Sequence, residues 1–225
     1  MTMAGKGKEL MEELRQVVTG KTLDALLPPL IFAVSNNLWG LSSAVRLALG
    51  FSLLLGMRRL LLKQKVSYAL GGFLMVAAAS GLALVTQNAT NYFISSAVTS
   101  GTLLAAALVT LLMGKPLAAL ASHLSRGWPL DWFWRIDVKP AYREVTLFWA
   151  VFFALRLSLQ VMLLRSGDAL RLAWANTLLG WPVTVAVLVI SYLYGIWRLH
   201  NLGGPGVDEY RKNLPPPWRG QVRGF

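Results

Sequence analysis

Six apolar stretches separated by polar connections dominate the pattern of hydrophobic and polar positions along the chain. They cover approximately residues 23–39, 41–57, 66–86, 93–113, 144–164 and 174–197. A helix needs about 20 apolar residues to cross a hydrocarbon core of about 30 Å, and the last four stretches meet that length. The pattern therefore predicts an all-α fold, a polytopic membrane helix bundle with about six transmembrane segments.

The first two stretches are short, and Pro28-Pro29 shortens the first one further because proline removes a helical hydrogen bond. Two arrangements are open for this pair. The segments either tilt within the bilayer or form a hairpin that thins it locally. Both outer ends of such a hairpin face the same side, so neither arrangement changes the predicted topology of the other segments.

Basic residues alternate from one connection to the next, and this alternation predicts the orientation of the bundle. They concentrate in residues 6–21, 58–65, 115–143 and 198–223. The opposite connections hold no charge at 37–41 and 87–92, and only Arg165, Asp168 and Arg171 between the last two stretches. Because basic loops stay on the cytoplasmic side, both termini are expected in the cytoplasm.

The same pattern divides the chain into three parts. Residues 1–21 are predicted to form an amphipathic cytoplasmic segment that lies on the membrane surface. The alternative is that they form a frayed helical end. Residues 22–200 form the predicted six-segment membrane domain, whose one sizeable cytoplasmic loop covers 114–143. Residues 201–225 are rich in Gly, Pro and charge and predict a disordered cytoplasmic tail.

Composition supports the membrane class and indicates which class of molecule the protein binds. Of 225 residues, 55% are hydrophobic and 14% charged, against about 25% charged in a soluble domain. The net charge of +12 lies in bases that flank apolar segments. Anionic lipid headgroups are therefore the expected partner, and nucleic acid is not. The chain has no cysteine, which excludes disulfides and thiolate sites.

The long cytoplasmic loop contains an aromatic cluster at residues 127–135, with Trp128, Trp132, Trp134 and Arg135 as its candidate docking residues. An exposed aromatic cluster is typical of a surface that binds a partner protein. The alternative is a membrane-interface anchor, because the apolar ring and N–H group of tryptophan are both satisfied in the headgroup zone.

Two arginines, Arg46 and Arg156, fall inside apolar stretches, where burying a charge is costly. Gln160 lies one helical turn from Arg156, and Asn176 is a polar neutral group in the last stretch. A guanidinium in a cavity can hold a phosphate or carboxylate with two donors. These four residues are thus the candidate site for an anion or an anionic lipid. The alternative for both arginines is snorkelling to the lipid phosphates.

No constellation of acid–base, nucleophilic or metal-binding residues is recognisable in the sequence. We therefore expect a non-enzymatic protein without a cofactor or a metal. Small residues are frequent in the third and fourth stretches, which favours close helix packing there. The same faces are also compatible with a homodimer.

Several short motifs resemble the DUF3159 family of bacterial, mainly actinobacterial, integral membrane proteins of unknown function. The motifs are Ala141–Ala150 continuing to Arg156 and Gln160, Gly180-Trp181-Pro182, Gly114-Lys115-Pro116-Leu117, Leu26-Leu27-Pro28-Pro29 and Trp134-Arg135-Ile136-Asp137. Some of them also resemble the related septation protein A family. One departure is that residues 87–91 lack a basic turn associated with DUF3159.

The resemblance implies a multi-pass protein of the bacterial inner (plasma) membrane. It favours a non-enzymatic role in cell-envelope or septation processes through contacts with lipids and with envelope or division proteins. The alternative function is a small transporter, channel or lipid-translocating protein with its anion site around Arg156.

Overall fold

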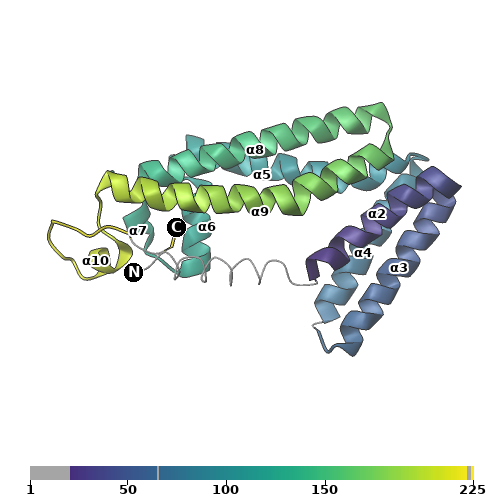
Figure 1. Ribbon diagram of the computed structural model, residues 1–225, viewed down its shortest axis with the longest axis horizontal. Helices are drawn as coiled ribbons and strands as arrows, with labels where there is room; N and C mark the ends of the chain where they lie inside the picture. Colours follow the sequence, from purple (N-terminus) through teal and green to yellow (C-terminus); the bar gives the residue numbers. More distant parts are fainter. Residues whose placement is uncertain (1–20, 65, 222–223) are drawn as a thin grey trace. The chain divides into compact units, whose positions relative to one another are not determined.

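A computed structural model describes residues 21–64, 66–221 and 224–225, and Figure 1 shows its elements. They are α2 (Lys21–Trp39), α3 (Leu41–Leu61), α4 (Val66–Val85), η1 (Ala89–Phe93), α5 (Ile94–Leu112), α6 (Leu117–Arg126), α7 (Leu130–Phe133), α8 (Lys139–Ser166), α9 (Ala169–Leu202) and α10 (Val207–Arg211). The described residues contain helices and loops but no strand, which confirms the predicted all-α fold. The amphipathic segment expected at 1–21 falls, except for its last residue, outside the described ranges.

Each of the six predicted apolar stretches coincides with one of the long helices, and the two last helices extend furthest beyond the prediction. Pro140 lies in the first turn of α8, where its missing N–H costs no helical hydrogen bond. The Asp168 carboxylate accepts a hydrogen bond from Arg171 N in the first turn of α9, at 2.9 Å. Gly203 follows α9 with φ of 65°, the left-handed conformation that ends many helices.

Three stretches of the described chain are long and apolar enough to cross a membrane: Ala89–Leu112, Lys139–Ser166 and Ala169–Leu202. Leu70–Val85 is a shorter apolar helix. The helices α2 and α3 are the less apolar pair, since α2 contains Pro28 and Pro29 and α3 carries Arg46 and two arginines in its last turn. The chain therefore has the helices of a membrane protein.

The chain divides into two compact units, which are described separately. Unit 1 comprises Met1–Ser96 and Gln160–Trp181, and unit 2 comprises Ala97–Leu159 and Pro182–Phe225. Residues of both long helices, α8 and α9, contribute to each unit.

The core of unit 1 combines small residues on α3 with aromatic rings from α2 and η1. Ala44 and Ala48 are fully buried, and Gly40, with φ of 77°, makes the tight turn between α2 and α3. The ring of Phe32 stacks on Tyr92 with centroids 4.0 Å apart. Asn88 caps η1 by accepting a hydrogen bond from Thr90 N at 3.0 Å, which fixes the helical turn that carries Tyr92.

Unit 2 is built around a cluster of aromatic residues near the start of α8. Trp132, Phe133 and Tyr142 are each 0% exposed, and the Phe133 and Tyr142 rings meet edge to face at 4.9 Å. The Thr146 hydroxyl accepts a hydrogen bond from Ala118 N at 3.1 Å, which joins α6 to α8. A second apolar cluster of unit 2 contains Phe152, Phe153 and Val187.

The segment after α9 differs from the disordered tail that its composition predicts. It forms the short helix α10, and Val207 is buried in the aromatic cluster. The Phe225 ring stacks on Tyr142 with centroids 4.3 Å apart. The physical reason is that Glu209 and Gln221 accept hydrogen bonds from backbone N–H groups of the segment, and Pro205 O accepts one from the distant Trp132, which local composition does not reveal.

Candidate functional site

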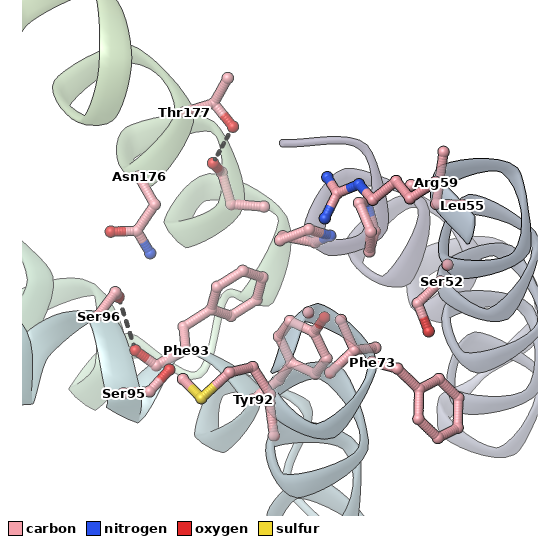
Figure 2. A pocket seen from close by; sticks show the side chains of 18 residues that line it. Ser52, Leu55, Arg59, Phe73, Tyr92, Phe93, Ser95, Ser96, Asn176 and Thr177 are labelled. Atoms are coloured by element: carbon pink, nitrogen blue, oxygen red, sulfur yellow. Dashed lines mark hydrogen bonds between the residues drawn. The ribbon is translucent and has the colours of Figure 1, made fainter. Parts of the chain in front are cut away.

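A cavity of about 300 Å³ lies within unit 1, at the lower end of the range for ligand pockets. Its walls come from α2, α3, α4, η1, the start of α5 and the start of α9 (Figure 2). The polar residues that line it are Ser52, Arg59, Ser95, Ser96, Asn176 and Thr177. The pocket therefore places several hydrogen-bonding groups inside an otherwise apolar unit.

The rest of the wall is mostly apolar. Phe73, Tyr92 and Phe93 line the pocket, and Figure 2 shows the Tyr92 and Phe93 rings near its middle and the Phe73 ring directed away from it. Tyr92 and Phe93 meet edge to face with centroids 5.0 Å apart, and both are buried in the core of unit 1. One side of the pocket is thus formed by packed aromatic rings.

The side chains of Gln160 and Asn176 form an amide pair at the polar side of the pocket. Gln160 is 1% exposed, and its Nε2 donates to Asn176 Oδ1 at 2.6 Å. A second, longer contact of 3.4 Å joins Gln160 Nε2 to the Ser96 hydroxyl. The pair links the end of α8 with the start of α9 and orients Asn176 in the pocket wall.

This amide pair leaves two buried polar atoms unused. Gln160 Oε1 and Asn176 Nδ2 have no hydrogen-bond partner among the described residues. A buried polar group without a partner costs about 1–3 kcal/mol. The pocket wall is therefore chemically incomplete.

Arg59 supplies the charged group of the pocket. It lies in the last turn of α3, and a Cβ atom at Gly72 of α4 would be 3.4 Å from its Nη1. A side chain at position 72 would thus meet the guanidinium at ordinary van der Waals distance. Figure 2 shows Arg59 and Asn176 on different sides of the pocket, from α3 and α9 respectively.

The four predicted anion-site residues have different positions in the structure. Gln160 and Asn176 come together in unit 1, as described above. Arg46 is exposed and donates to Ser42 O on its own helix at 3.2 Å, so it lies outside the pocket lining. Arg156 belongs to unit 2, and its buried Nε has no hydrogen-bond partner among the described residues.

Sequence reasoning missed Arg59 because it counted this residue among the cytoplasmic loop bases. A usable signal was present. Consecutive residues on a helix point about 100° apart, so Arg58 and Arg59 cannot both face outward in the same direction. The structure leaves Arg58 exposed and Arg59 half-buried.

The predicted docking cluster, Trp128, Trp132, Trp134 and Arg135, lies in unit 2 and is covered by the chain itself. Trp132 is 0% exposed, and its Nε1 donates to Pro205 O at 2.9 Å. Trp128 and Trp134 are half-buried. The expectation of an exposed surface is wrong for Trp132, because the segment after α9 occupies that face.

Arg135 is likewise held within unit 2. Two of its guanidinium nitrogens donate to the Asp137 carboxylate at 2.9 and 2.7 Å. The hydrogen bond to Asp137 raises the pKa of Arg135 above its usual range. Its guanidinium also lies over the rings of Tyr210 and Trp218, at 5.9 and 5.3 Å from their centroids. Arg135 thus supports the fold of the loop.

The described residues contain no group of three or more His, Cys, Asp or Glu side chains that could hold a metal ion. The described helices define the class as an all-helical membrane protein with a partly polar pocket. The family model of DUF3159, a protein of unknown function, matches residues 19–198, and the chain belongs to this family. Neither the curated proteins nor the solved structures contain a significant match to the chain.

Proposed function

We propose that this protein is a non-enzymatic, multi-pass component of the bacterial inner membrane that retains a lipid in the pocket of unit 1. One observation carries the proposal. Asn176 Nδ2 is a buried donor without a partner among the described residues, in the wall of a pocket of about 300 Å³. A ligand with an acceptor group would complete the wall, and in a membrane lipids are the most abundant such molecules.

The proposed topology has six segments with both termini in the cytoplasm. Its support is the alternation of basic and uncharged connections. The tight turn at Gly40 is compatible with α2 and α3 entering from the same side as a pair. Retention of a lipid by such a bundle would serve the envelope or septation role that the family resemblance favours, together with contacts to envelope or division proteins.

A transporter or lipid-translocating protein is the second candidate, and the polar side chains of Ser96, Asn176 and Thr177 in the pocket wall favour it. A carrier needs a water-accessible path to this site. Single cysteines introduced at Ser96 and Thr177 would then react with aqueous thiol reagents, and the native chain contributes no background because it has no cysteine.

The proposal is tested by native mass spectrometry of the protein extracted with its own lipids. We expect a lipid bound in a fixed ratio to the native chain and its loss from Asn176→Leu. The matched control is Asn37→Leu, at an exposed position near the end of α2. Release of all lipid from the native chain under mild conditions would overturn the proposal.

A further inference from the structure

We infer that unit 2 carries a separate site for the headgroup of an anionic phospholipid, formed by Lys115, Lys139 and Arg143 where the end of α5 meets the start of α8. All three bases belong to unit 2. The inference goes beyond the lipid proposed for the pocket of unit 1, since none of these bases lines that pocket.

The chain brings the end of α5 and the start of α8 to the same place. Gly114 follows α5 in the left-handed conformation, with φ of 67°. A Cβ atom at Gly114 would lie 3.4 Å from Nζ of Lys139, the first residue of α8. Lys115 follows Gly114 directly, and Arg143 lies one helical turn after Lys139 on the same face of α8. The three bases are thus neighbours although they come from two elements.

A cavity of about 400 Å³ adjoins these bases. Its lining includes Pro140, Arg143 and Leu147 of α8 and Leu111 near the end of α5. Arg143 and Leu147 are exposed, so the cavity opens to the surface of unit 2. A lipid at this site can therefore exchange with the surrounding membrane.

The acidic groups beside the cavity are already paired with other residues. Glu144, which completes the lining, accepts hydrogen bonds from Arg198 Nε at 2.8 Å and from Arg198 Nη2 at 3.0 Å. Asp137 is paired with Arg135 at 2.7 Å. Among the described residues, no acidic side chain forms an ion pair with any of the three bases. Their positive charges therefore favour an anionic ligand.

The surroundings place the bases at the depth of lipid headgroups. The apolar stretch Ala89–Leu112 ends just before this site. Tyr194 and Trp197 of α9 are 39% and 56% exposed, and their ring centroids are 5.6 Å apart. The Tyr194 hydroxyl donates at 2.7 Å to Glu144, the neighbour of Arg143 in the chain. Exposed tyrosine and tryptophan are typical of the boundary between membrane and water.

The apolar residues of the cavity favour a lipid over a free anion. Leu111 and Leu147 contribute to its lining from α5 and α8. A hydrated phosphate ion would gain nothing from these side chains, whereas the first methylene groups of an acyl chain would be removed from water by them. The bases and the leucines together thus match a charged headgroup joined to hydrocarbon.

A general attraction of basic segments to an anionic membrane is the competing explanation. It predicts that every exposed base contributes equally, wherever it lies. Lys63 and Lys212 are exposed bases outside the cavity lining. The pair Lys63→Gln with Lys212→Gln therefore removes the same net charge as Lys139→Gln with Arg143→Gln and leaves the site intact.

The experiment titrates phosphatidylglycerol or phosphatidylcholine into the full chain in a mild detergent, and native mass spectrometry counts the bound lipids. The chain and both paired variants also carry Asn176→Leu, which is expected to empty the pocket of unit 1. We expect phosphatidylglycerol to bind more tightly than phosphatidylcholine. The pair Lys139→Gln with Arg143→Gln should weaken phosphatidylglycerol binding by about 25-fold, or about 5-fold for each base, and the control pair should leave it unchanged.

The same titration of the chain with Asn176 in place keeps the test independent of that substitution. There, the lipid retained through extraction is subtracted, and one further phosphatidylglycerol should bind. Far-ultraviolet circular dichroism confirms that each variant is folded.

The failures of the two proposals are distinguishable. Equal weakening by the two paired variants would overturn the site in unit 2, since it would show a general attraction. Equal binding of the two lipids would also overturn it, because phosphatidylcholine is zwitterionic. Neither result affects the lipid proposed for unit 1, whose retention is measured by its loss from Asn176→Leu.

Discussion

One group of buried polar contacts in each unit differs in how completely its members are paired. In unit 2, Trp132 donates to Pro205 O, and Arg135 is paired with Asp137. In unit 1, Gln160 and Asn176 satisfy each other only in part and leave a donor and an acceptor unused beside a cavity. The contacts of Trp132 and Arg135 are explained by folding. For the amide pair, which borders a cavity, we propose a ligand.

The largest expected effect is the loss of stability in Trp132→Ala. This change removes a fully buried ring and leaves Pro205 O without its donor. We expect the free energy of unfolding to fall by about 3–5 kcal/mol, as for other buried aromatic residues. The measurement is the Tm by circular dichroism in detergent.

The control for that prediction is Trp197→Ala, at a position that is 56% exposed. It should shift the Tm far less than Trp132→Ala. Equal shifts would contradict the interpretation of the unit 2 cluster as a structural core and would restore its interpretation as a partner-binding surface.

A smaller effect is expected from protonation of Glu209, which holds the segment after α9 together. Its carboxylate accepts hydrogen bonds from Gly206 N and Arg219 N at 2.8 Å each and from Gly220 N at 3.2 Å. Partial burial acts to raise the pKa of Glu209, but these three donors outweigh it and hold the pKa below the usual carboxylate range.

The sign of the pH dependence follows from that lowered pKa. The stabilisation is fully present above the pKa of the unfolded state, about 4.3 for Glu, and is lost as the pH falls through the lower folded pKa. We expect amide hydrogen exchange in residues 206–221, corrected for its intrinsic rate, to increase on acidification. Glu209→Gln should show the faster exchange already at neutral pH, and Asp208→Asn, on the exposed side of α10, should not.

The smallest effect on stability is expected at the amide pair of Gln160 and Asn176, where the effect on lipid binding should be large. Replacing both members of the amide pair, with Gln160→Leu and Asn176→Leu, removes the two unused polar atoms together with their mutual hydrogen bond. We expect the free energy of unfolding to change by less than about 1 kcal/mol, since paired polar groups replaced by apolar ones of similar shape are nearly neutral. Bound lipid should be lost.

The single change Gln160→Leu serves as the contrast. It leaves Asn176 Oδ1 without its donor and should destabilise the protein more than the double change does. A double variant that unfolds, or one that keeps its lipid, would contradict the difference drawn between the two units.

Much of the fold was predictable because long apolar runs reveal helices without any tertiary information. The runs at 144–164 and 174–197 each fall within one continuous helix. The order of the segment after α9 was not predictable. Its contacts join residues as far apart as Trp132 and Pro205, and several of them use backbone groups whose availability the residue types do not indicate.

Of the candidate site, only the uncharged amide residues were predictable from the sequence. Gln160 and Asn176 stand out because amides are rare in apolar helices, and the structure brings them together at 2.6 Å. Arg59 does not stand out, since it follows Arg58 at the end of an apolar run and resembles an ordinary loop base. Its half-buried position beside Gly72 of the next helix is a tertiary property.

The contacts of Glu209 also have an evolutionary consequence. All three of its partners are main-chain N–H groups, so their side chains contribute nothing to these hydrogen bonds. Homologous chains should therefore be free to vary at position 219 while they keep an acidic residue at 209. Position 206 should vary little for a separate reason, because a Cβ there would lie 2.8 Å from Gly220 O. Sequence drift in this segment would thus preserve its shape while it erases most of its recognisable sequence.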